Sequence, residues 1–512
     1  MRRLTVTAVL ACLTGCASTP KPSTAIPAAP SAAGPTATAP APAPAAAPVP
    51  ERITPDAPFR QLPPPAGPEA VFHPPAWKRF KLKNGLEVVL VEFHDLPLVD
   101  FNLMVKTGGA ANPPDRAGLA ELCARMLDEG TKTRSALEIA DQLAALGATL
   151  SSGSSWDASN VSLQALSRNL DGALALFADV VQNPVFDPKE TARVRDNLLT
   201  AITRRKDSPP TVANLTMARI LYGPKHPYGW PMAGVESSIK AVGPNELRAF
   251  YDAYYHPNNA VLIVAGDTTE AALRTKLEAA FGKWKSKRVA PRKLPAAAAP
   301  TATKIFLVDK ADAPQSSIRV GAIGIDRASA DYFPVTVMNL ILGGGFHRLD
   351  LNLREGKGWT YGARSTFDSR RTPGPFSAGG EFVAAHTAES VSEILKEMTG
   401  MRDADVADAE LSRAKDQIIK SFPARFATRA NVAAQLAELA VFGLPDSQVT
   451  EYAAKIAAVT KDDIRRVSRK YLDPARVAVV VVGDRKTLAE PLGKVAPVEL
   501  RDLDGDPIAE PK

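Results

Sequence analysis

Two stretches far apart in the chain follow the same pattern: Val242–Tyr254 (VGPNELRAFYDAY) and Val459–Tyr471 (VTKDDIRRVSRKY). The second begins 217 residues after the first (459 − 242 = 217), and the match continues without a gap. The apolar runs AVLIVA (260–265) and VAVVVV (477–482) both end at Gly-Asp. Each copy therefore predicts an amphipathic helix, a turn at a proline and a buried strand.

A further match lies upstream, where four residues recur at an offset of 220: Glu190, Arg193, Asp196 and Leu199 against Glu410, Arg413, Asp416 and Ile419. A period of about 220 residues is much longer than that of solenoid repeats, so we interpret it as a domain duplication. The change of offset by three fits one small insertion or deletion. The boundary is expected near 284–303, where a basic stretch gives way to Pro- and Ala-rich sequence.

Each half mixes strands and helices, which predicts the α+β class. Residues 86–92 and 98–105 are predicted to be strands that pair as a hairpin, and the second half opens with strands at 304–309 and 317–325. Helical periodicity follows at about 117–128, 136–146, 169–181 and 188–205, and again near 331–342, 387–400, 407–421 and 428–442.

Composition excludes several classes of protein. The 512 residues suffice for two or three domains, and a net charge of +7 without blocks of like charge gives no support to nucleic-acid binding. Three cysteines exclude a disulfide scaffold.

The N-terminal sequence predicts a targeting signal. Met1-Arg2-Arg3 precedes a short apolar stretch (4–13), which has the form of a secretory signal too short to span a membrane permanently. Leu13-Thr14-Gly15-Cys16 resembles a bacterial lipobox, which implies cleavage after residue 15 and lipidation of Cys16. Because Ala17 follows, the resemblance favours the periplasmic side of the outer membrane. The alternative is an ordinary cleaved signal with an incidental cysteine.

The proline excess belongs to one segment, since 16 of the 44 prolines lie between residues 17 and 70. Such a sequence cannot bury a core, so residues 16–67 are predicted to be a disordered Pro/Ala-rich tether. The remaining chain divides into an N-terminal domain, a linker, a C-terminal domain and a tail, with expected bounds of 68–285, 286–302, 303–495 and 496–512.

Several motifs together resemble the insulinase/pitrilysin-type (inverzincin) zinc peptidases, especially the processing-peptidase-like branch. The resemblance covers about residues 70–490, and the quoted stretches are LKNGLEV (82–88), GLA (118–120), EGT (129–131), GVESSIKA (234–241), GGG (343–345), LREGKGWTY (353–361) and FGLP (442–445). It implies two similar α+β domains, each a mixed, mainly antiparallel sheet packed with helices, which face each other around a cleft.

The metal site of this family is degenerate here. Family enzymes hold Zn²⁺ with H-x-x-E-H, in which two histidines one helical turn apart bind the metal and the glutamate activates water. The corresponding positions are Glu121, Ala124 and Arg125, and no carboxylate occurs near 200–202, where the third ligand is expected. We therefore expect this chain to bind no metal. We infer that Glu121 and Arg125 pair in the vacated space; the alternative is two unrelated solvated side chains. Cys123 is expected in the core.

The second half keeps another part of the family pattern. Arg354 and Tyr361 match a substrate-binding Arg/Tyr pair, in which the tyrosine hydroxyl donates to the oxyanion and the guanidinium holds substrate oxygens. Gly343, Gly344 and Gly345 are predicted to allow close backbone approach and left-handed conformations near the substrate. The alternative is that Arg354 and Tyr361 are ordinary residues of a loop and a strand.

The resemblance implies a non-catalytic, substrate-binding subunit that is inactive alone. A related partner with H-x-x-E-H would bring Zn²⁺, and this chain would bring Arg354 and Tyr361 for proteolysis in the cell envelope. One alternative is a peptide-binding or scaffold lipoprotein without proteolytic role. A self-sufficient zinc endopeptidase is the other, and the missing ligands argue against it.

Overall fold

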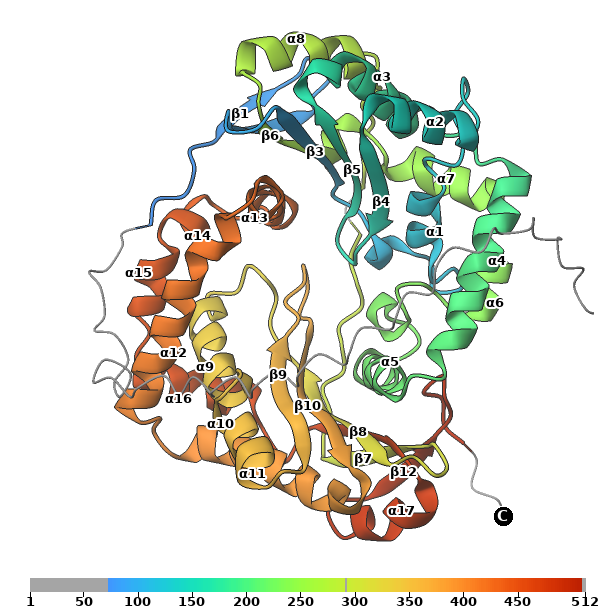
Figure 1. Ribbon diagram of the computed structural model, residues 1–512. Helices are drawn as coiled ribbons and strands as arrows, with labels where there is room; N and C mark the ends of the chain where they lie inside the picture. Colours follow the sequence, from blue (N-terminus) through green and yellow to red (C-terminus); the bar gives the residue numbers. More distant parts are fainter. Residues whose placement is uncertain (1–71, 291, 509–512) are drawn as a thin grey trace, which may run out of the picture. The chain divides into compact units, whose positions relative to one another are not determined.

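The computed structural model describes residues 72–290 and 292–508 (Figure 1). These residues belong to one compact unit. The predicted signal segment, Cys16 and the tether 16–67 lie outside the described residues. Within the described ranges, no helix is long and apolar enough to cross a membrane.

The first half is built on a six-stranded sheet of order β1-β2-β6-β3-β5-β4. Its strands are β1 (Lys78–Lys81), β2 (Glu87–Glu92), β3 (Leu98–Val105), β4 (Thr149–Ser154), β5 (Ser159–Leu166) and β6 (Ala260–Gly266). β2 and β6 run parallel, and the other neighbours are antiparallel. Every residue of β6 is buried, as expected for an uninterrupted apolar run inside a sheet.

The predicted hairpin of 86–92 with 98–105 is wrong, because β6 lies between β2 and β3. Val89 of β2 pairs with Ile263, and Ile263 pairs on its other side with Asn102 of β3. The inner four residues of β2 are all buried, so this strand needs an apolar neighbour as well as covered faces. A strand that arrives more than 150 residues later supplies it, and local sequence cannot show this.

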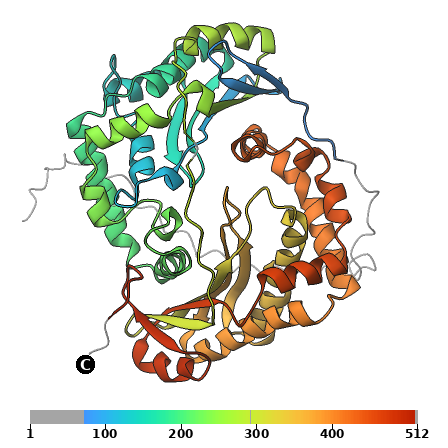
Figure 2. The same cartoon turned by 180° about the vertical axis from the view of Figure 1, so that it is seen from behind.

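The second half repeats the plan with the order β12-β7-β11-β8-β10-β9. Its strands are β7 (Lys304–Asp309), β8 (Gln315–Ile323), β9 (Thr360–Phe367), β10 (Pro375–Val383), β11 (Ala478–Gly483) and β12 (Val498–Arg501). Again the late strand, β11, lies between the first two, which confirms the duplication. One boundary needs correction: residues 496–512 were expected to be only a tail, but β12 pairs with β7 at the sheet edge. Both sheets can be followed from behind in Figure 2.

The predicted helices are confirmed, with small shifts at their ends. The first half contains α1 (Leu119–Arg125), α2 (Ala136–Leu146), α3 (Leu170–Gln182), α4 (Pro188–Arg205), α5 (Pro209–Tyr222), α6 (Glu236–Lys240), α7 (Pro244–Tyr254) and α8 (Glu270–Phe281). The second contains α9 (Tyr332–Gly343), α10 (Arg348–Asp350), α11 (Thr387–Asp403), α12 (Asp408–Ser421), α13 (Arg429–Phe442), α14 (Ser447–Thr450), α15 (Tyr452–Ala457), α16 (Lys461–Tyr471) and α17 (Arg485–Gly493).

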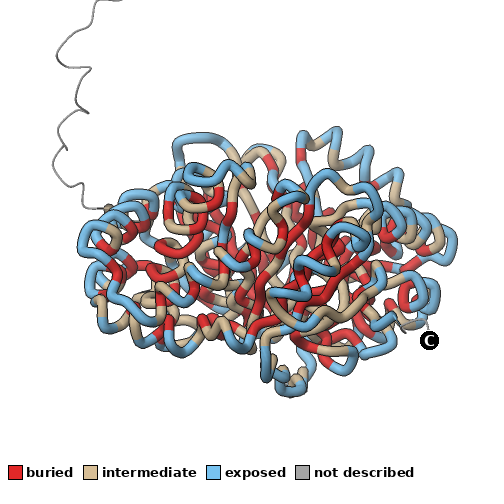
Figure 3. The backbone as a smooth tube through the Cα atoms, turned by 90° about the horizontal axis from the view of Figure 1, so that it is seen from below, coloured by how far each residue is buried: buried red, intermediate tan, exposed pale blue. Residues whose placement is uncertain are grey.

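Each half contributes one helix that packs on the sheet of the other half, an arrangement called here the helix exchange. Leu262 and Val264 of β6 join the core of the first half, whereas Val261 and Ile263 on the opposite face join the core of the second. The helix that covers this opposite face is α13, and α5 of the first half packs in return on β8 and β11. Burial therefore runs through both sheets, with exposed residues on the outer loops and helix faces (Figure 3).

Candidate functional site

Helix α1 carries Glu121, Ala124 and Arg125, the positions at which the resemblance predicts the metal-binding motif. It begins at Gly118, whose backbone is left-handed (φ +90°). A Cβ there would lie 2.5 Å from Ile239 Cδ1 and 2.8 Å from the carbonyl oxygen of Ala233, so only glycine fits. The apolar side of α1 is buried as predicted. Cys123 is fully buried, and burial raises the pKa of its thiol, so it is a core residue rather than a nucleophile.

The inferred pair of Glu121 and Arg125 is confirmed. Arg125 Nε donates to Glu121 Oε1 at 2.6 Å, and the carboxylate is almost buried while the guanidinium is half-exposed. Glu121 Oε2 also accepts a hydrogen bond from the backbone N–H of Ser154 at 3.0 Å, at the end of edge strand β4. The carboxylate thus fixes α1 to β4, an anchoring role that the sequence did not reveal.

No other ligand completes a metal site around α1. Ala124, at the position where the resemblance predicts the catalytic glutamate, is fully buried. The expected position of the third ligand lies on α4, which contacts α1, but residues 200–202 are Thr, Ala and Ile. Across the described ranges, no group of three or more His, Cys, Asp and Glu side chains could hold a metal ion.

Tyr361 lies near the start of β9, the edge strand of the second sheet, and is 93% exposed. Ala363 pairs with Gly380 and Thr360 with Phe382, so Tyr361 and Gly362 together face the single residue Glu381. This two-against-one arrangement is a β-bulge, a feature that re-aims side chains and is common beside functional sites. At this bulge, the Tyr361 side chain points into solvent although its backbone belongs to a strand.

Arg354 lies on a π-helical turn, residues 351–356, which follows α10. π-Helical turns are rare and concentrate at functional sites. Its guanidinium is partly exposed, with Nη1 3.7 Å from Asp350 Oδ2 and Nε 3.3 Å from Glu355 Oε1. Arg354 therefore keeps donors for a further acceptor.

Asp350 is a site residue that sequence reasoning missed. Its side chain is completely buried, and Oδ2 accepts a hydrogen bond from the backbone N–H of Phe346 at 3.1 Å. Its other oxygen, Oδ1, has no hydrogen-bond partner among the described residues. Asp350 thus lies beneath Arg354 and holds the turn that leads into this segment.

The expectation for Gly343, Gly344 and Gly345 is only half right. Close approach is confirmed at Gly343, where a Cβ would lie 2.1 Å from the backbone nitrogen of Ser365 on β9. Left-handed geometry is not found at these glycines but at Phe346 (φ +59°), which is 63% exposed. The glycines allow the end of α9 to pack closely against β9, and the left-handed backbone conformation is adopted by the next residue, Phe346. A non-glycine residue in this conformation is unfavourable and often marks a functional segment.

The predicted site residues therefore form two groups. Glu121, Ala124 and Arg125 share α1, and Gly343–Gly345, Arg354 and Tyr361 lie on β9 or on the segments that pack against it. No hydrogen bond or ion pair between described residues joins the two groups, so the expected cleft stays a prediction. Each group adjoins an edge strand, β4 or β9, whose outer backbone groups have no strand partner.

Two family models match the chain. "Insulinase (Peptidase family M16)" matches residues 87–226, and "Peptidase M16 inactive domain" matches residues 241–418. Together with the duplicated fold, these matches show that the chain belongs to the insulinase-type M16 peptidase family.

Relatives in bacteria agree. An "Uncharacterized zinc protease YmxG" of Bacillus subtilis is 25% identical over 67% of this chain and 82% of its own length. An "Uncharacterized zinc protease" of Rickettsia felis is 25% identical over 78% of this chain and 96% of its length. The crystal structure of a peptidase M16 inactive domain from Pseudomonas fluorescens superposes with a TM-score of 0.74 at 28% identity, over 80% of this chain and 98% of that one. A protease from Helicobacter pylori shares the fold with a TM-score of 0.71 at 21% identity, over 80% and 99%.

Proposed function

We propose that this chain is the non-catalytic, substrate-binding subunit of an M16 peptidase in the cell envelope. A related partner with H-x-x-E-H brings Zn²⁺ and the base, and this chain brings Arg354 and Tyr361. The observation that carries the proposal is the contrast between the two groups. Glu121 and Arg125, where the resemblance predicts metal ligands, form an ion pair on α1, whereas Tyr361 is 93% exposed on a bulge beside the π-helical Arg354.

The chemistry assigned to the pair follows from its donors. A tyrosine hydroxyl can donate to the oxyanion that forms when water attacks a peptide carbonyl, and an arginine can hold substrate oxygens with its fixed fork of N–H groups. The open edges of β4 and β9 suit an extended peptide, since strand addition satisfies backbone groups along its length.

The test is a comparison of the purified chain with and without a co-expressed relative that carries H-x-x-E-H. We expect no stoichiometric zinc and no peptide cleavage by this chain alone, and both from the complex. In the complex, Arg354→Ala and Tyr361→Phe should each lower kcat by about 10²–10³-fold, as the loss of an oxyanion donor does. Arg413→Ala and Tyr254→Phe, which change residues outside both groups, serve as matched controls.

The outcomes separate the alternatives. Zinc and cleavage by this chain alone would make it a self-sufficient endopeptidase. A stable complex whose cleavage ignores Arg354→Ala and Tyr361→Phe would remove the roles assigned to them. Peptide binding without any cleaving partner would favour the peptide-binding or scaffold lipoprotein.

Localisation is a separate part of the proposal. Supported by the lipobox-like Leu13–Cys16, we propose a lipid anchor at Cys16 on the periplasmic side of the outer membrane. Growth with a radiolabelled fatty acid should label the wild-type chain but not Cys16→Ser, and fractionation should release Cys16→Ser from the membranes. Labelling that persists in Cys16→Ser would contradict the anchor.

A further inference from the structure

A second feature of the first half lies apart from both groups described above. A hollow of about 940 Å³ opens among α2, α3, α7 and α8 and the loop that precedes α2. None of its lining residues belongs to α1, to β9 or to the second half. Its volume lies within the range of ligand-binding pockets.

The floor of the hollow is apolar and firmly built. Ala175 and Ala178 of α3 and Ala279 and Ala280 of α8 line it with short side chains, and α3 packs against α8. Trp284 closes one end, with its indole N–H donating to the carbonyl oxygen of Tyr255 at 3.2 Å.

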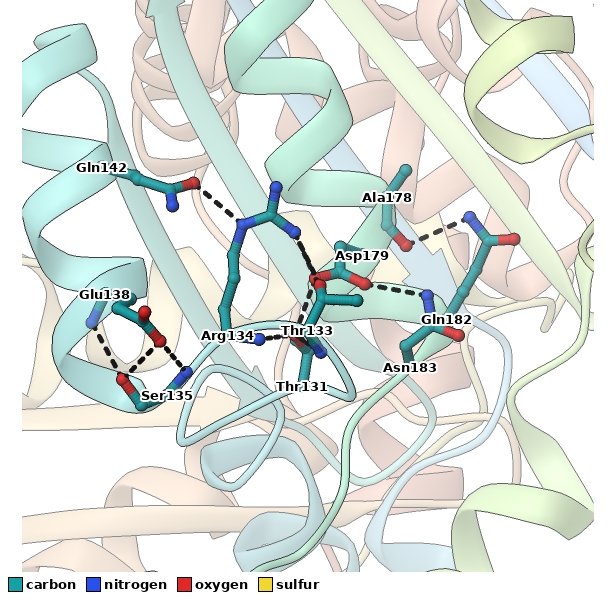
Figure 4. Close-up of polar contacts among 10 residues, drawn as sticks. All are labelled: Thr131, Thr133, Arg134, Ser135, Glu138, Gln142, Ala178, Asp179, Gln182 and Asn183. Atoms are coloured by element: carbon teal, nitrogen blue, oxygen red, sulfur yellow. Dashed lines mark hydrogen bonds and ion pairs between the residues drawn. The ribbon is translucent and has the colours of Figure 1, made fainter.

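Both carboxylates in the lining are committed to local hydrogen bonds (Figure 4). Asp179 Oδ2 accepts from Thr131 Oγ1 at 2.6 Å, from Thr133 Oγ1 at 2.9 Å and from Arg134 Nη1 at 2.6 Å. Glu138 Oε2 accepts from the backbone N–H and the hydroxyl of Ser135, both at 2.8 Å, as a capping box of α2. Neither carboxylate forms an ion pair with Lys132, Lys283 or Lys285.

The rim carries lysines without such partners. Lys132 lies on the loop before α2, and Lys283 and Lys285 follow α8 on the other side. All three are exposed, and none forms an ion pair with another described residue. With Arg134, the lining has four cationic side chains against Glu138 and Asp179, which leaves a net charge of +2 (4 − 2).

The duplication provides an internal comparison. His256 in the lining aligns with Asp473 at the offset of 217 residues. Asp473 pairs with Arg402 at 3.0 Å, so the second half balances charge internally at this position. In the first half, both ring nitrogens of His256 face backbone carbonyl oxygens, of Lys285 and Asp252, so no carboxylate stands at this position.

We propose that this hollow, named here the lysine hollow and defined by Lys132, Lys283, Lys285 and the alanine floor, binds an acidic segment of another protein chain. Lysines on opposite sides of an apolar floor match a segment in which carboxylates alternate with apolar side chains. Charge complementarity of this kind steers encounter and fixes register. The opening is broad, which suits a polypeptide segment that enters and leaves it.

The test uses the full chain and a fluorescent peptide of alternating Glu and Leu, with the Gln–Leu peptide as the neutral probe. We expect anisotropy to show binding of the Glu peptide that weakens as salt screens the charges, and much weaker binding of the Gln peptide. The variant K132E/K283E/K285E should lose at least about tenfold in affinity, since three pairings become repulsions. Bound Glu peptide should also protect these lysines from an amine-reactive reagent.

The matched control is K81E/K189E/K225E, which makes the same charge change at exposed lysines outside the lysine hollow. Equal losses in the two variants would reduce the effect to net charge and overturn the proposal. Binding of phosphatidylglycerol vesicles without binding of the Glu peptide would overturn it in favour of a lipid surface. Thermal melts of both variants check folding, and unchanged peptide affinity in a folded K132E/K283E/K285E would also overturn it.

Discussion

Glu121, where the family resemblance predicts a metal-binding histidine, forms structural hydrogen bonds. Its carboxylate bridges the guanidinium of Arg125 on its own helix and the backbone N–H of Ser154 on β4. The two contacts differ in energy, because Arg125 is half-exposed whereas the bond to Ser154 is partly buried and joins two elements. Exposed ion pairs contribute little, and a partly buried hydrogen bond to a charged group contributes more.

Glu121→Ala should therefore lower the free energy of unfolding by about 1–3 kcal/mol, since it removes the acceptor for Ser154. Arg125→Ala should cost less than about 1 kcal/mol. Urea denaturation of both variants measures this order. Lys240→Ala, which breaks the fully exposed pair with Glu236, is the control, and a larger cost for Arg125→Ala than for Glu121→Ala would contradict the anchoring role.

Asp331 predicts a pH dependence. It accepts hydrogen bonds from Arg466, Lys470 Nζ at 2.9 Å and Tyr471 Oη at 2.7 Å, which fix α16 to the start of α9. Burial raises the pKa of Asp331, but the hydrogen bonds from Lys470, Tyr471 and Arg466 outweigh it, and the net pKa lies well below its ordinary value.

A depressed folded-state pKa gives stability that is present above the unfolded-state pKa, about 3.9, and is lost as pH falls below it. Asp331→Asn should thus cost about 2 kcal/mol at neutral pH and flatten the loss of stability in acid. Asp462→Asn is the control for denaturation series at several pH values, because Asp462 lies on α16, the helix that binds Asp331, and forms no ion pair among the described residues. If Asp331→Asn loses as much stability in acid as the wild-type chain, the acid-dependent part of the free energy of unfolding comes from other carboxylates.

At the scale of elements, the end of α9 packs closely against β9 because Gly343 has no side chain. Gly343→Ala would bring a Cβ within 2.1 Å of the Ser365 backbone nitrogen, so strand or helix must move. We expect a loss of about 1–3 kcal/mol in chemical denaturation, as for overpacked cores. Gly493→Ala, where no heavy atom lies within 4 Å of the added Cβ, should be close to neutral. Equal effects of the two substitutions would argue against the close approach.

Helix α1 predicts the result of restoring the family pattern. E121H/A124E/R125H recreates H-x-x-E-H, but Ala124 is fully buried, so the new carboxylate costs stability without a cation beside it. The third ligand is also absent on α4. We expect a lower Tm and no stoichiometric zinc after dialysis, and a gain in zinc only when Thr200→Glu or Ala201→Glu is added. Stoichiometric zinc in the triple variant alone would show that two histidines suffice.

Sequence patterns predicted these elements unevenly, for physical reasons. Helical periodicity located α2 and α4 with their bounds, since each has a clear cap and an apolar stripe. The order of strands failed at β2 and β3, because pairing with β6 is a non-local interaction. At the candidate site, motifs predicted Arg354 and Tyr361 as site residues, but the bulge, the π-helical turn and buried Asp350 depend on packing that no spacing reveals.

At the scale of the whole molecule, the helix exchange makes each half depend on the other. Without α13, the face of β6 that bears Val261 and Ile263 would be exposed, and without α5 so would part of β8 and β11. A cut within 286–290 or 292–302, where no helix or strand forms and most residues are exposed, should therefore leave both fragments associated. Limited proteolysis followed by size-exclusion chromatography checks this. Separation of the fragments in native buffer would contradict it, and denaturing gels confirm that the cut occurred.

The same exchange limits how the two halves could open. A hinge confined to residues 286–302 cannot separate them, because α5 would stay seated on the second sheet and α13 on the first. Any opening must also bend the chain where it enters and leaves these helices, for example at 206–208 between α4 and α5. Opening therefore requires backbone changes in several of these connecting segments at once. Substitutions that stiffen one such segment should slow access of a large substrate without changing Arg354 or Tyr361.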